Sequence, residues 1–328
     1  MPNSESRPVA IGTAAALLLL AACRAGLPAP GAAAPGTYRH EIEFDVDRTA
    51  LVHLPAGYDP ARPMPLVVAI HGAFETAGQF ESLTGLSQAA DEDGFVVAYP
   101  EGRGILGWVQ HWNAGFCCAK AKHERWDDVG FLERLVAELT SRLAIDPSRV
   151  AVVGFSNGGM LAYRFAAERR ELIRALAVSG AAIGGQEEGE VAMASVQPAA
   201  RPLPVLVMHG KLDGSIPYAG GRSPRHSDIT YLGPLEATAR FARANGCSEP
   251  VLDSRADGVT IARWNGCAPG AEVTFVSVEK LGHWWPRDGA RGEPSGFDGT
   301  EELRRFLRRA FDRPELPVKL PATGDEQR

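Results

Sequence analysis

One serine lies between small residues in the stretch Gly154-Phe155-Ser156-Asn157-Gly158, between the largely β-branched run Val150 to Val153 and a helix-forming segment, Met160 to Glu168. The pattern G-x-S-x-G is frequent by chance and can mark only a glycine-rich turn. Here the strand before it and the helix after it favour a sharp, strained turn that lifts a serine hydroxyl above the carboxyl end of a sheet. We therefore predict that Ser156 is a nucleophile.

A serine hydroxyl needs a base, and an acid must orient that base. In α/β-hydrolases the chain order is Ser, then Asp or Glu, then His. Asp213 follows the apolar run 204–208, and His283 follows the last predicted strand, so both are expected beyond carboxyl ends of strands, where ligands bind in open α/β sheets. We predict Asp213 as the acid and His283 as the base. The alternatives are a turn-capping Asp213 and a structural His283, with His226 as a competing base.

An oxyanion needs two backbone N–H donors, one after the nucleophile and one from the loop after an earlier strand. We expect the first from Asn157, at the start of the helix. The second candidate is Ala73, which follows the apolar run 64–70, although the segment could be an ordinary turn. His71 and His209 are expected to brace these loops. No cofactor or metal is expected, because the sequence has no H-E-x-x-H and no close cluster with ligand spacing.

The surrounding segments alternate between apolar strands and amphipathic helices. Strands are expected at 41–46, 48–54, 64–70, 95–99, 150–153, 176–179, 204–208, 260–264 and 273–279, and helices at 83–92, 129–143, 160–168, 235–244 and 301–311. The first two strands suit an antiparallel pair at a sheet edge, and Asp127 and Asp128 are expected to cap the helix that follows them. Residues 100–122 and 180–201 are expected to be irregular loops. The alternation predicts the α/β class, with a mostly parallel, doubly wound sheet covered by helices on both faces, in one domain at 37–312.

The 328 residues are 45% hydrophobic and 23% charged, which is ordinary for a globular protein with a core. A net charge of −6 and the lack of a basic run argue against a nucleic-acid partner. A small or polymeric neutral molecule is the expected partner, and the oligomeric state is left open.

Residues 1–22 are typical of a lipoprotein signal peptide. An apolar run after Arg7 is too short for a membrane span and ends in Leu20-Ala21-Ala22-Cys23, which resembles a bacterial lipobox. The resemblance implies acylation of Cys23 and a periplasmic, outer-membrane or cell-surface lipoprotein. Simple export, with Cys23 incidental, is the alternative. Residues 23–36 are expected to be a flexible tether and 313–328 a disordered tail.

Export makes the four remaining cysteines informative. Cys247 ends a predicted helix and Cys267 closes a predicted strand, so we expect a disulfide between them. Cys117 and Cys118 are adjacent, and a vicinal disulfide and two buried thiols are equally open.

Three motifs together resemble the secreted polyhydroxybutyrate depolymerase and feruloyl esterase group of carbohydrate esterase family one, in the α/β-hydrolase fold. They are the serine motif 154–160, His209-Gly210-x-x-Asp213 with Pro217-Tyr218, and Gly282-His283-x-Trp285-Pro286. Trp112 with the paired cysteines, and the segment 127–131, are also similar. The resemblance covers about 65–286 and implies Ser156, Asp213 and His283 as the triad. The chain departs from many depolymerases at Ala73, Asn157 and Trp284, which leaves the chemistry intact and questions the polymer substrate.

Four tryptophans lie on loops expected at the catalytic edge: Trp108, Trp112, Trp284 and Trp285. Aromatic faces there suit a feruloyl ring, a sugar or a flat polyester segment, and packing for stability is the alternative for each. Trp112 and Trp284 are the candidates for substrate contact.

The sequence therefore predicts an exported serine esterase that acts on feruloyl, acetyl or hydroxyalkanoate esters. A serine peptidase on the same fold is a second interpretation, but such enzymes usually carry an extra domain. A lipoprotein binding module with an inactive hydrolase fold is a third, although all three triad candidates are present.

Overall fold

The computed structural model describes residues 26–29, 31, 33–105, 109–226, 228–254, 258–287 and 296–313. The predicted signal peptide, the predicted lipidation site Cys23, Trp108 and nearly all of the predicted tail lie outside these residues. Among the described residues no helix has the length and apolarity to cross a membrane.

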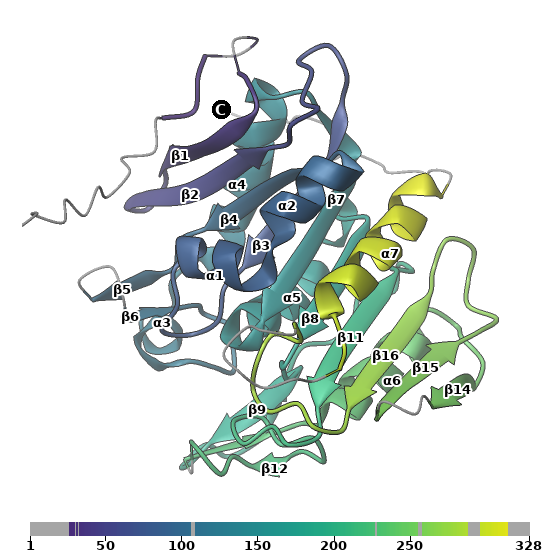
Figure 1. Ribbon diagram of the computed structural model, residues 1–328. Coiled ribbons are helices and arrows are strands. Elements are labelled where there is room, and N and C mark those ends of the chain that lie inside the picture. The colour runs from purple at the N-terminus through teal and green to yellow at the C-terminus, as the bar shows by residue number, and fades with distance from the viewer. Residues whose placement is uncertain are drawn as a thin grey trace, which may run out of the picture.

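A ten-stranded sheet runs through the whole molecule (Figure 1). Its strand order is β1-β2-β4-β3-β7-β8-β11-β16-β15-β14, and the six strands from β4 to β16 are parallel to one another. The antiparallel strands β1 and β2 form one edge, as predicted, and β15 and β14 form the other. The strands are β1 (Gly36–Glu43), β2 (Asp47–Leu54), β3 (Met64–Ile70), β4 (Val96–Pro100), β7 (Ile145–Phe155), β8 (Ala175–Ser179), β11 (Val205–Gly210), β14 (Pro250–Ser254), β15 (Val259–Trp264) and β16 (Val273–Val278).

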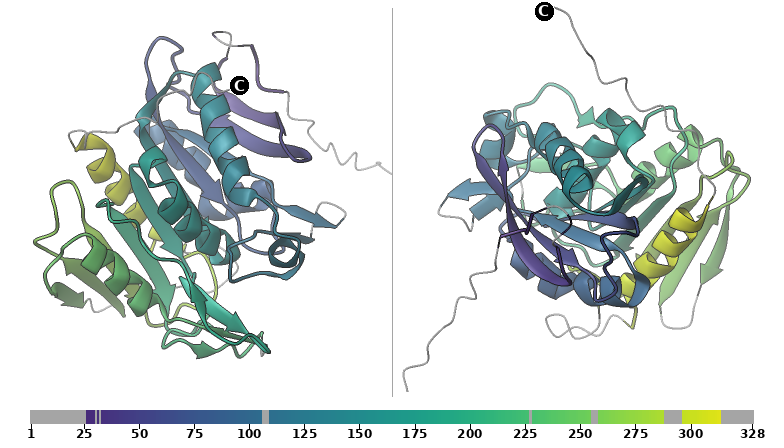
Figure 2. Two further views of the ribbon diagram at one scale, coloured as in Figure 1. Left: turned by 180° about the vertical axis from the view of Figure 1, so that it is seen from behind. Right: turned by 90° about the horizontal axis from the view of Figure 1, so that it is seen from above.

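Helices cover both faces of this sheet (Figure 2). One face packs against α1 (Ala77–Thr84), α2 (Leu86–Asp93) and α7 (Gly299–Asp312), and the other against α4 (Asp128–Arg142), α5 (Ser156–Glu168) and α6 (Pro234–Ala244). The central strands are buried on both faces, which explains their continuous apolar sequences. The predicted doubly wound architecture is confirmed.

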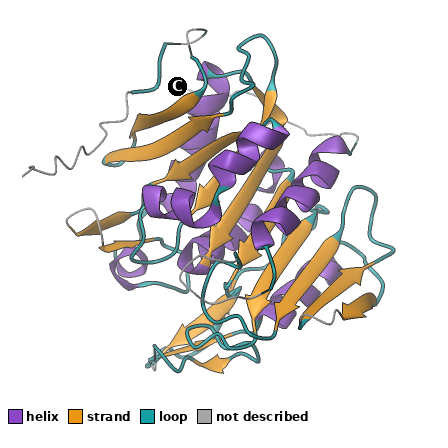
Figure 3. Ribbon diagram, viewed as in Figure 1, coloured by secondary structure: helices purple, strands orange, loops and turns teal. Residues whose placement is uncertain are grey.

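Two small sheets lie where irregular loops were expected (Figure 3). Between β8 and α6 the chain forms a four-stranded sheet of β9 (Gly184–Glu187), β10 (Ala194–Ser195), β12 (Gly221–Arg222) and β13 (Ile229–Tyr231). Residues 100–122 contain the hairpin β5 (Arg103–Ile105) and β6 (Val109–His111) and most of the short helix α3 (Ala119–His123), and a 3₁₀ turn, η1 (Arg170–Leu172), follows α5. These elements are too short to show a hydrophobic period, so the sequence did not reveal them.

Two further local predictions were wrong. The helix expected at 83–92 corresponds mainly to α2, and α1 before it was not expected; Gly85, in a left-handed conformation with φ of 63°, ends α1 and separates the two helices. Only Asp127 caps α4, through its side chain and the Gly130 N–H, whereas Asp128 is buried and faces Arg48.

Both cysteine pairs are bonded. Cys247 and Cys267 form the predicted disulfide, which joins the end of α6 to the end of β15. Cys117 and Cys118 form a vicinal disulfide, the first of the two alternatives left open by the sequence.

Candidate active site

Ser156 lies at the sharp junction between β7 and α5. Its φ is 52°, a left-handed conformation that a residue with a side chain adopts only where the surrounding structure imposes it. A Cβ on Gly158 would collide with the carbonyl oxygen of His71, and one on Gly154 would collide with the backbone of Gly158. The small residues of the motif are therefore required by close packing of the strand, the helix and the loop after β3.

His283 lies between the serine and the predicted acid. Its Nε2 is 2.8 Å from Ser156 Oγ, and its Nδ1 is 2.7 Å from Asp213 Oδ2. The other oxygen of Asp213 accepts the backbone N–H groups of Ser215 and Ile216 at 2.8 and 2.7 Å. The structure thus brings the three predicted residues together in a hydrogen-bonded chain, with the geometry that a serine nucleophile and its base require.

Asp213 is buried and remains a carboxylate. Burial by itself raises its pKa, but the hydrogen bond and charge of His283 outweigh that effect, and the pKa lies below its ordinary value. A negative charge therefore faces Nδ1 of His283 throughout the neutral range and favours the proton on that nitrogen. Nε2 is then left as an acceptor toward the Ser156 hydroxyl.

The buried histidines His71 and His209 both hold loops, as the sequence suggested. His209 Nε2 donates to the Ile216 carbonyl at 2.9 Å, and burial lowers its pKa. His71 Nδ1 donates to the Gly72 carbonyl at 2.7 Å, and its Nε2 accepts the Gly102 N–H at 3.1 Å. Burial lowers the His71 pKa to about 4, so this ring is neutral at pH 7.

The loop after β3 leaves one backbone donor available beside Ser156. Gly72 N–H is taken by Glu75 Oε2 at 2.9 Å, and Phe74 N–H by the Gln110 carbonyl at 2.9 Å. Within the described part of the chain, the Ala73 N–H between them has no acceptor. The Asn157 N–H belongs to the first turn of α5, where N–H groups have no acceptor in the helix. Both residues line the same cavity as Ser156, which fits the predicted pair of oxyanion donors.

That cavity has a volume of about 270 Å³ and opens beside Ser156 and His283. Its wall combines apolar side chains with acidic and imidazole groups, including Met160, Ile216, Ile229, Tyr231, the Cys117–Cys118 pair, His123, Glu187, His226 and Asp228. Phe74 stands at its rim, 59% exposed, with φ of 64° and its ring 4.6 Å from that of His111. An aromatic residue held exposed in a left-handed conformation is unusual and points to a role in contact with ligand.

The predicted substrate contact of Trp112 is wrong, whereas that of Trp284, which is partly buried, stays a prediction. Trp112 is fully buried, and its indole N–H donates to the His71 carbonyl at 2.9 Å. Trp285 is buried against Phe80, and Trp284 packs on the same core, so none of the three lines the cavity. Loop position alone does not distinguish a tryptophan that faces a ligand from one that fills the interior.

Part of the cavity wall could not be predicted from the sequence, because it comes from the small four-stranded sheet (Glu187, Ile229 and Tyr231) and from α3 (Ala119 and His123). The alternation of apolar and polar residues over Ile229, Thr230 and Tyr231 is a two-residue strand period, but three residues are too few to be recognised. No group of three or more metal-ligating side chains occurs among the described residues.

Comparison with known proteins identifies relatives of the chain. Residues 43–215 match the family model Esterase, described as "Putative esterase". Feruloyl esterase B of Piromyces equi is 30% identical over 79% of this chain, which spans only 45% of that protein. "Putative esterase NocK" of Nocardia uniformis subsp. tsuyamanensis is 31% identical over 78% of this chain and 76% of its own length.

A likeness among solved structures supports the fold. The acetyl xylan esterase from Aspergillus awamori matches 83% of this chain and 99% of its own, with a TM-score of 0.56 and 14% identity. At such identity the likeness shows the architecture alone, and it agrees with the predicted α/β-hydrolase fold.

Proposed function

The chain belongs to the esterase family, and on this premise we propose that it is an exported serine carboxylesterase that acts through Ser156, His283 and Asp213. The observation that carries the proposal is the hydrogen-bonded chain from Ser156 Oγ through His283 to Asp213, at 2.8 and 2.7 Å. Export is supported by the signal-like sequence at 1–22, and Cys23 is the proposed lipid attachment site.

The proposed mechanism is acyl transfer. Ser156 Oγ attacks the ester carbonyl carbon while its proton passes to His283 Nε2, and Asp213 stabilises the resulting imidazolium. The N–H groups of Asn157 and Ala73 bind the oxyanion, each worth about 3 kcal/mol in such sites. Collapse expels the alcohol, which takes the proton from His283. Water then gives its proton to His283 and attacks the acyl group, and the acid leaves as Ser156 regains its proton.

We propose feruloyl or acetyl esters of polysaccharides as the substrates. A cavity of about 270 Å³ suits a single aromatic acyl group better than a polyester segment. Its apolar wall suits an aromatic ring, and the carboxylates of Glu187 and Asp228 suit a phenolic hydroxyl at the ring edge. The name of the relative from Piromyces equi, Feruloyl esterase B, supports the same class.

A second cavity, of about 310 Å³, supports a polymeric alcohol. It shares His111 and Ala119 with the first cavity and is also lined by Arg103, Lys120, Glu124 and Trp126. Polar, charged groups of this kind suit hydroxyl-rich sugars. A glycan attached to the scissile ester would extend along it from the serine.

Hydrolysis by the purified protein tests this proposal, with Ser156→Ala as the control. The substrates are methyl ferulate, a feruloylated xylan oligosaccharide, p-nitrophenyl acetate and a 3-hydroxybutyrate oligomer. We expect the highest kcat/KM with the feruloylated oligosaccharide, and a loss of roughly 10⁶-fold in kcat in Ser156→Ala, because the nucleophile is gone.

Each contrary outcome contradicts a defined part of the proposal. Preference for the hydroxybutyrate oligomer would make the protein a depolymerase. No turnover, together with no labelling by a fluorophosphonate probe, would favour an inactive binding module. Cleavage of peptides in place of esters would favour a peptidase.

A further inference from the structure

The side-chain amide of Asn157 makes two hydrogen bonds to the backbone of Trp112 and a longer one, at 3.5 Å, from Nδ2 to Cys118 Sγ. The Trp112 N–H donates to Asn157 Oδ1 at 2.8 Å, and Asn157 Nδ2 donates to the Trp112 carbonyl at 3.0 Å. Asn157 is 2% exposed, so its amide does not reach a substrate from solvent. The two bonds fix the residue after Ser156 to the segment that contains Trp112.

Trp112 also holds the opposite side of the oxyanion site. Its indole N–H donates to the carbonyl of His71 at 2.9 Å, two residues before Ala73. The backbone of Trp112 therefore binds the start of α5, and its side chain binds the loop after β3. These are the two elements that carry the proposed oxyanion donors.

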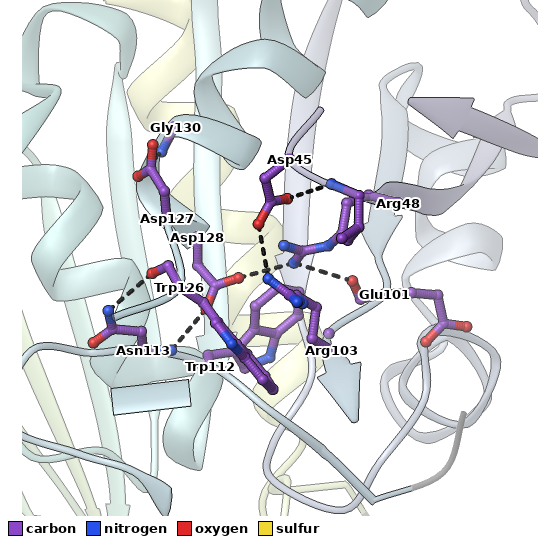
Figure 4. Close-up of polar contacts among 12 residues, drawn as sticks. Asp45, Arg48, Glu101, Arg103, Trp112, Asn113, Trp126, Asp127, Asp128 and Gly130 are labelled. Atoms are coloured by element: carbon purple, nitrogen blue, oxygen red, sulfur yellow. Dashed lines mark hydrogen bonds and ion pairs between the residues drawn. The ribbon is translucent and has the colours of Figure 1, made fainter. Parts of the chain in front are cut away.

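A buried ion pair between Arg48 and Asp128 holds the segment that contains Trp112 in place (Figure 4). Arg48 from β2 donates to Asp128 Oδ1 at 2.8 Å, and Asp128 Oδ2 accepts the N–H of Asn113, the residue after Trp112, at 2.7 Å. The Arg48 guanidinium also lies 3.9 Å from the centre of the Phe131 ring. The side chains of Arg48 and Asp128 are at most 2% exposed. Because a buried hydrogen-bonded ion pair is rigid, it fixes the backbone of Asn113, to which Asp128 is bound.

We propose that Trp112 and the Asn157 side chain form a positioning unit that sets the spacing of the two oxyanion donors. The inference rests on the proposed function, since it concerns how that site reaches its geometry. Oxyanion donors act by being fixed before the reaction, and a displacement of about 1 Å can cost on the order of 10²-fold in rate. Because substrate binding in the ground state does not need this spacing, the effect should fall on kcat and leave KM unchanged.

The experiment compares Asn157→Ala with Asn245→Ala. Asn245 is a matched control, because it is 2% exposed and binds the backbone of Leu203 in the same way, at 3.0 and 2.7 Å, away from the cavity. We expect Asn157→Ala to lower kcat by 10- to 100-fold on the best ester, with KM changed less than about threefold. Its affinity for an aryl boronic acid, which mimics the tetrahedral intermediate, should fall by a similar factor. Asn245→Ala should lower Tm and retain the wild-type kcat.

A second variant changes the other residue of the positioning unit, Trp112. Trp112→Phe removes the indole N–H but keeps an aromatic ring in the core and the backbone bonds to Asn157. It should lower kcat and boronate affinity together, and the double variant should lose less than the product of the two single effects. If Asn157→Ala does not fold, Trp112→Phe still tests the proposed positioning role.

The proposal is overturned if a folded Asn157→Ala or Trp112→Phe keeps kcat and boronate affinity within twofold of wild type. It is also overturned if Asn245→Ala loses kcat to the same extent, since general destabilisation would then explain the effect. A wild-type protein without esterase activity or fluorophosphonate labelling would instead contradict the proposed function, so the two failures are distinguishable.

Discussion

At the residue scale, the hydrogen bonds of single polar atoms set the orientation of the side chains around Ser156. One oxygen of the Asp213 carboxylate accepts hydrogen bonds from two backbone N–H groups, and the other oxygen is hydrogen-bonded to His283. His71 uses both ring nitrogens to hold the loop that carries Ala73. Because that ring is fully buried, its neutral form is part of the folded structure and its protonation opposes folding.

We predict that His71 makes the protein less stable in mild acid. Its pKa is about 4 when folded, chiefly because of burial and to a smaller extent because of the nearby His111 and Arg48, and about 6.5 for an unfolded histidine. As the pH falls below about 6.5, the unfolded chain binds a proton that the folded one does not, so stability falls until about pH 4. Between pH 7.5 and 5 this group should cost about 2 kcal/mol.

Urea unfolding at these two pH values measures the effect. His71→Asn should be less stable than wild type at pH 7.5, since it loses buried hydrogen bonds, but should lose about 2 kcal/mol less between pH 7.5 and 5. An equal loss in both proteins would show that His71 does not titrate on unfolding.

At the scale of elements, prediction succeeded where a segment is long and buried and failed where it is short. The strand at 64–70 and the serine turn were identified because continuous apolar residues and required glycines reflect packing on both faces. The proposed triad followed, since Asp213 and His283 come soon after strands of the parallel sheet. The part of the cavity wall on the small sheet could not be predicted, because it depends on the pairing of β9 with β13, two strands of three or four residues that lie more than 40 positions apart in the sequence (Glu187 pairs with Ile229). The buried role of Trp112 depends likewise on tertiary contacts that a loop sequence does not encode.

We predict that the disulfide between α6 and β15 contributes stability and not activity. Cys247 and Cys267 are 20 residues apart, and a bond closing a loop of that size is worth about 3 kcal/mol. Neither residue lines the cavity beside Ser156. The double variant Cys247→Ser/Cys267→Ser should therefore unfold at a lower urea concentration and keep its kcat at 25 °C. A large fall in kcat of the folded variant would contradict this separation.

At the scale of the whole molecule, the proposed catalytic residues and the proposed substrate contacts come from different parts of the fold. The large sheet carries Ser156, Asp213 and His283 on loops beyond its parallel strands. The four-stranded sheet is built from segments on either side of β11 and supplies Glu187, Ile229 and Tyr231 to the cavity.

We therefore predict that a larger side chain on the small sheet, placed so that it fills the cavity, changes the substrate selectivity and leaves the catalytic step unchanged. Ile229→Phe should lower kcat/KM for methyl ferulate at least tenfold by occupying the space of the ring, while p-nitrophenyl acetate is hydrolysed within about threefold of wild type. Val191→Phe is the control, because Val191 is fully exposed between β9 and β10 and does not line the cavity. Equal losses on both esters in Ile229→Phe would show that the small sheet also supports the triad.

The separate origin of the cavity wall bears on how such a protein can diversify. Segments whose strands pair with one another can change in length or sequence without shifting the register of the ten-stranded sheet. On the proposed assignment, a lineage built on this plan can thus exchange one acyl preference for another by mutation in 184–195 and 221–231, while the proposed triad is inherited unchanged.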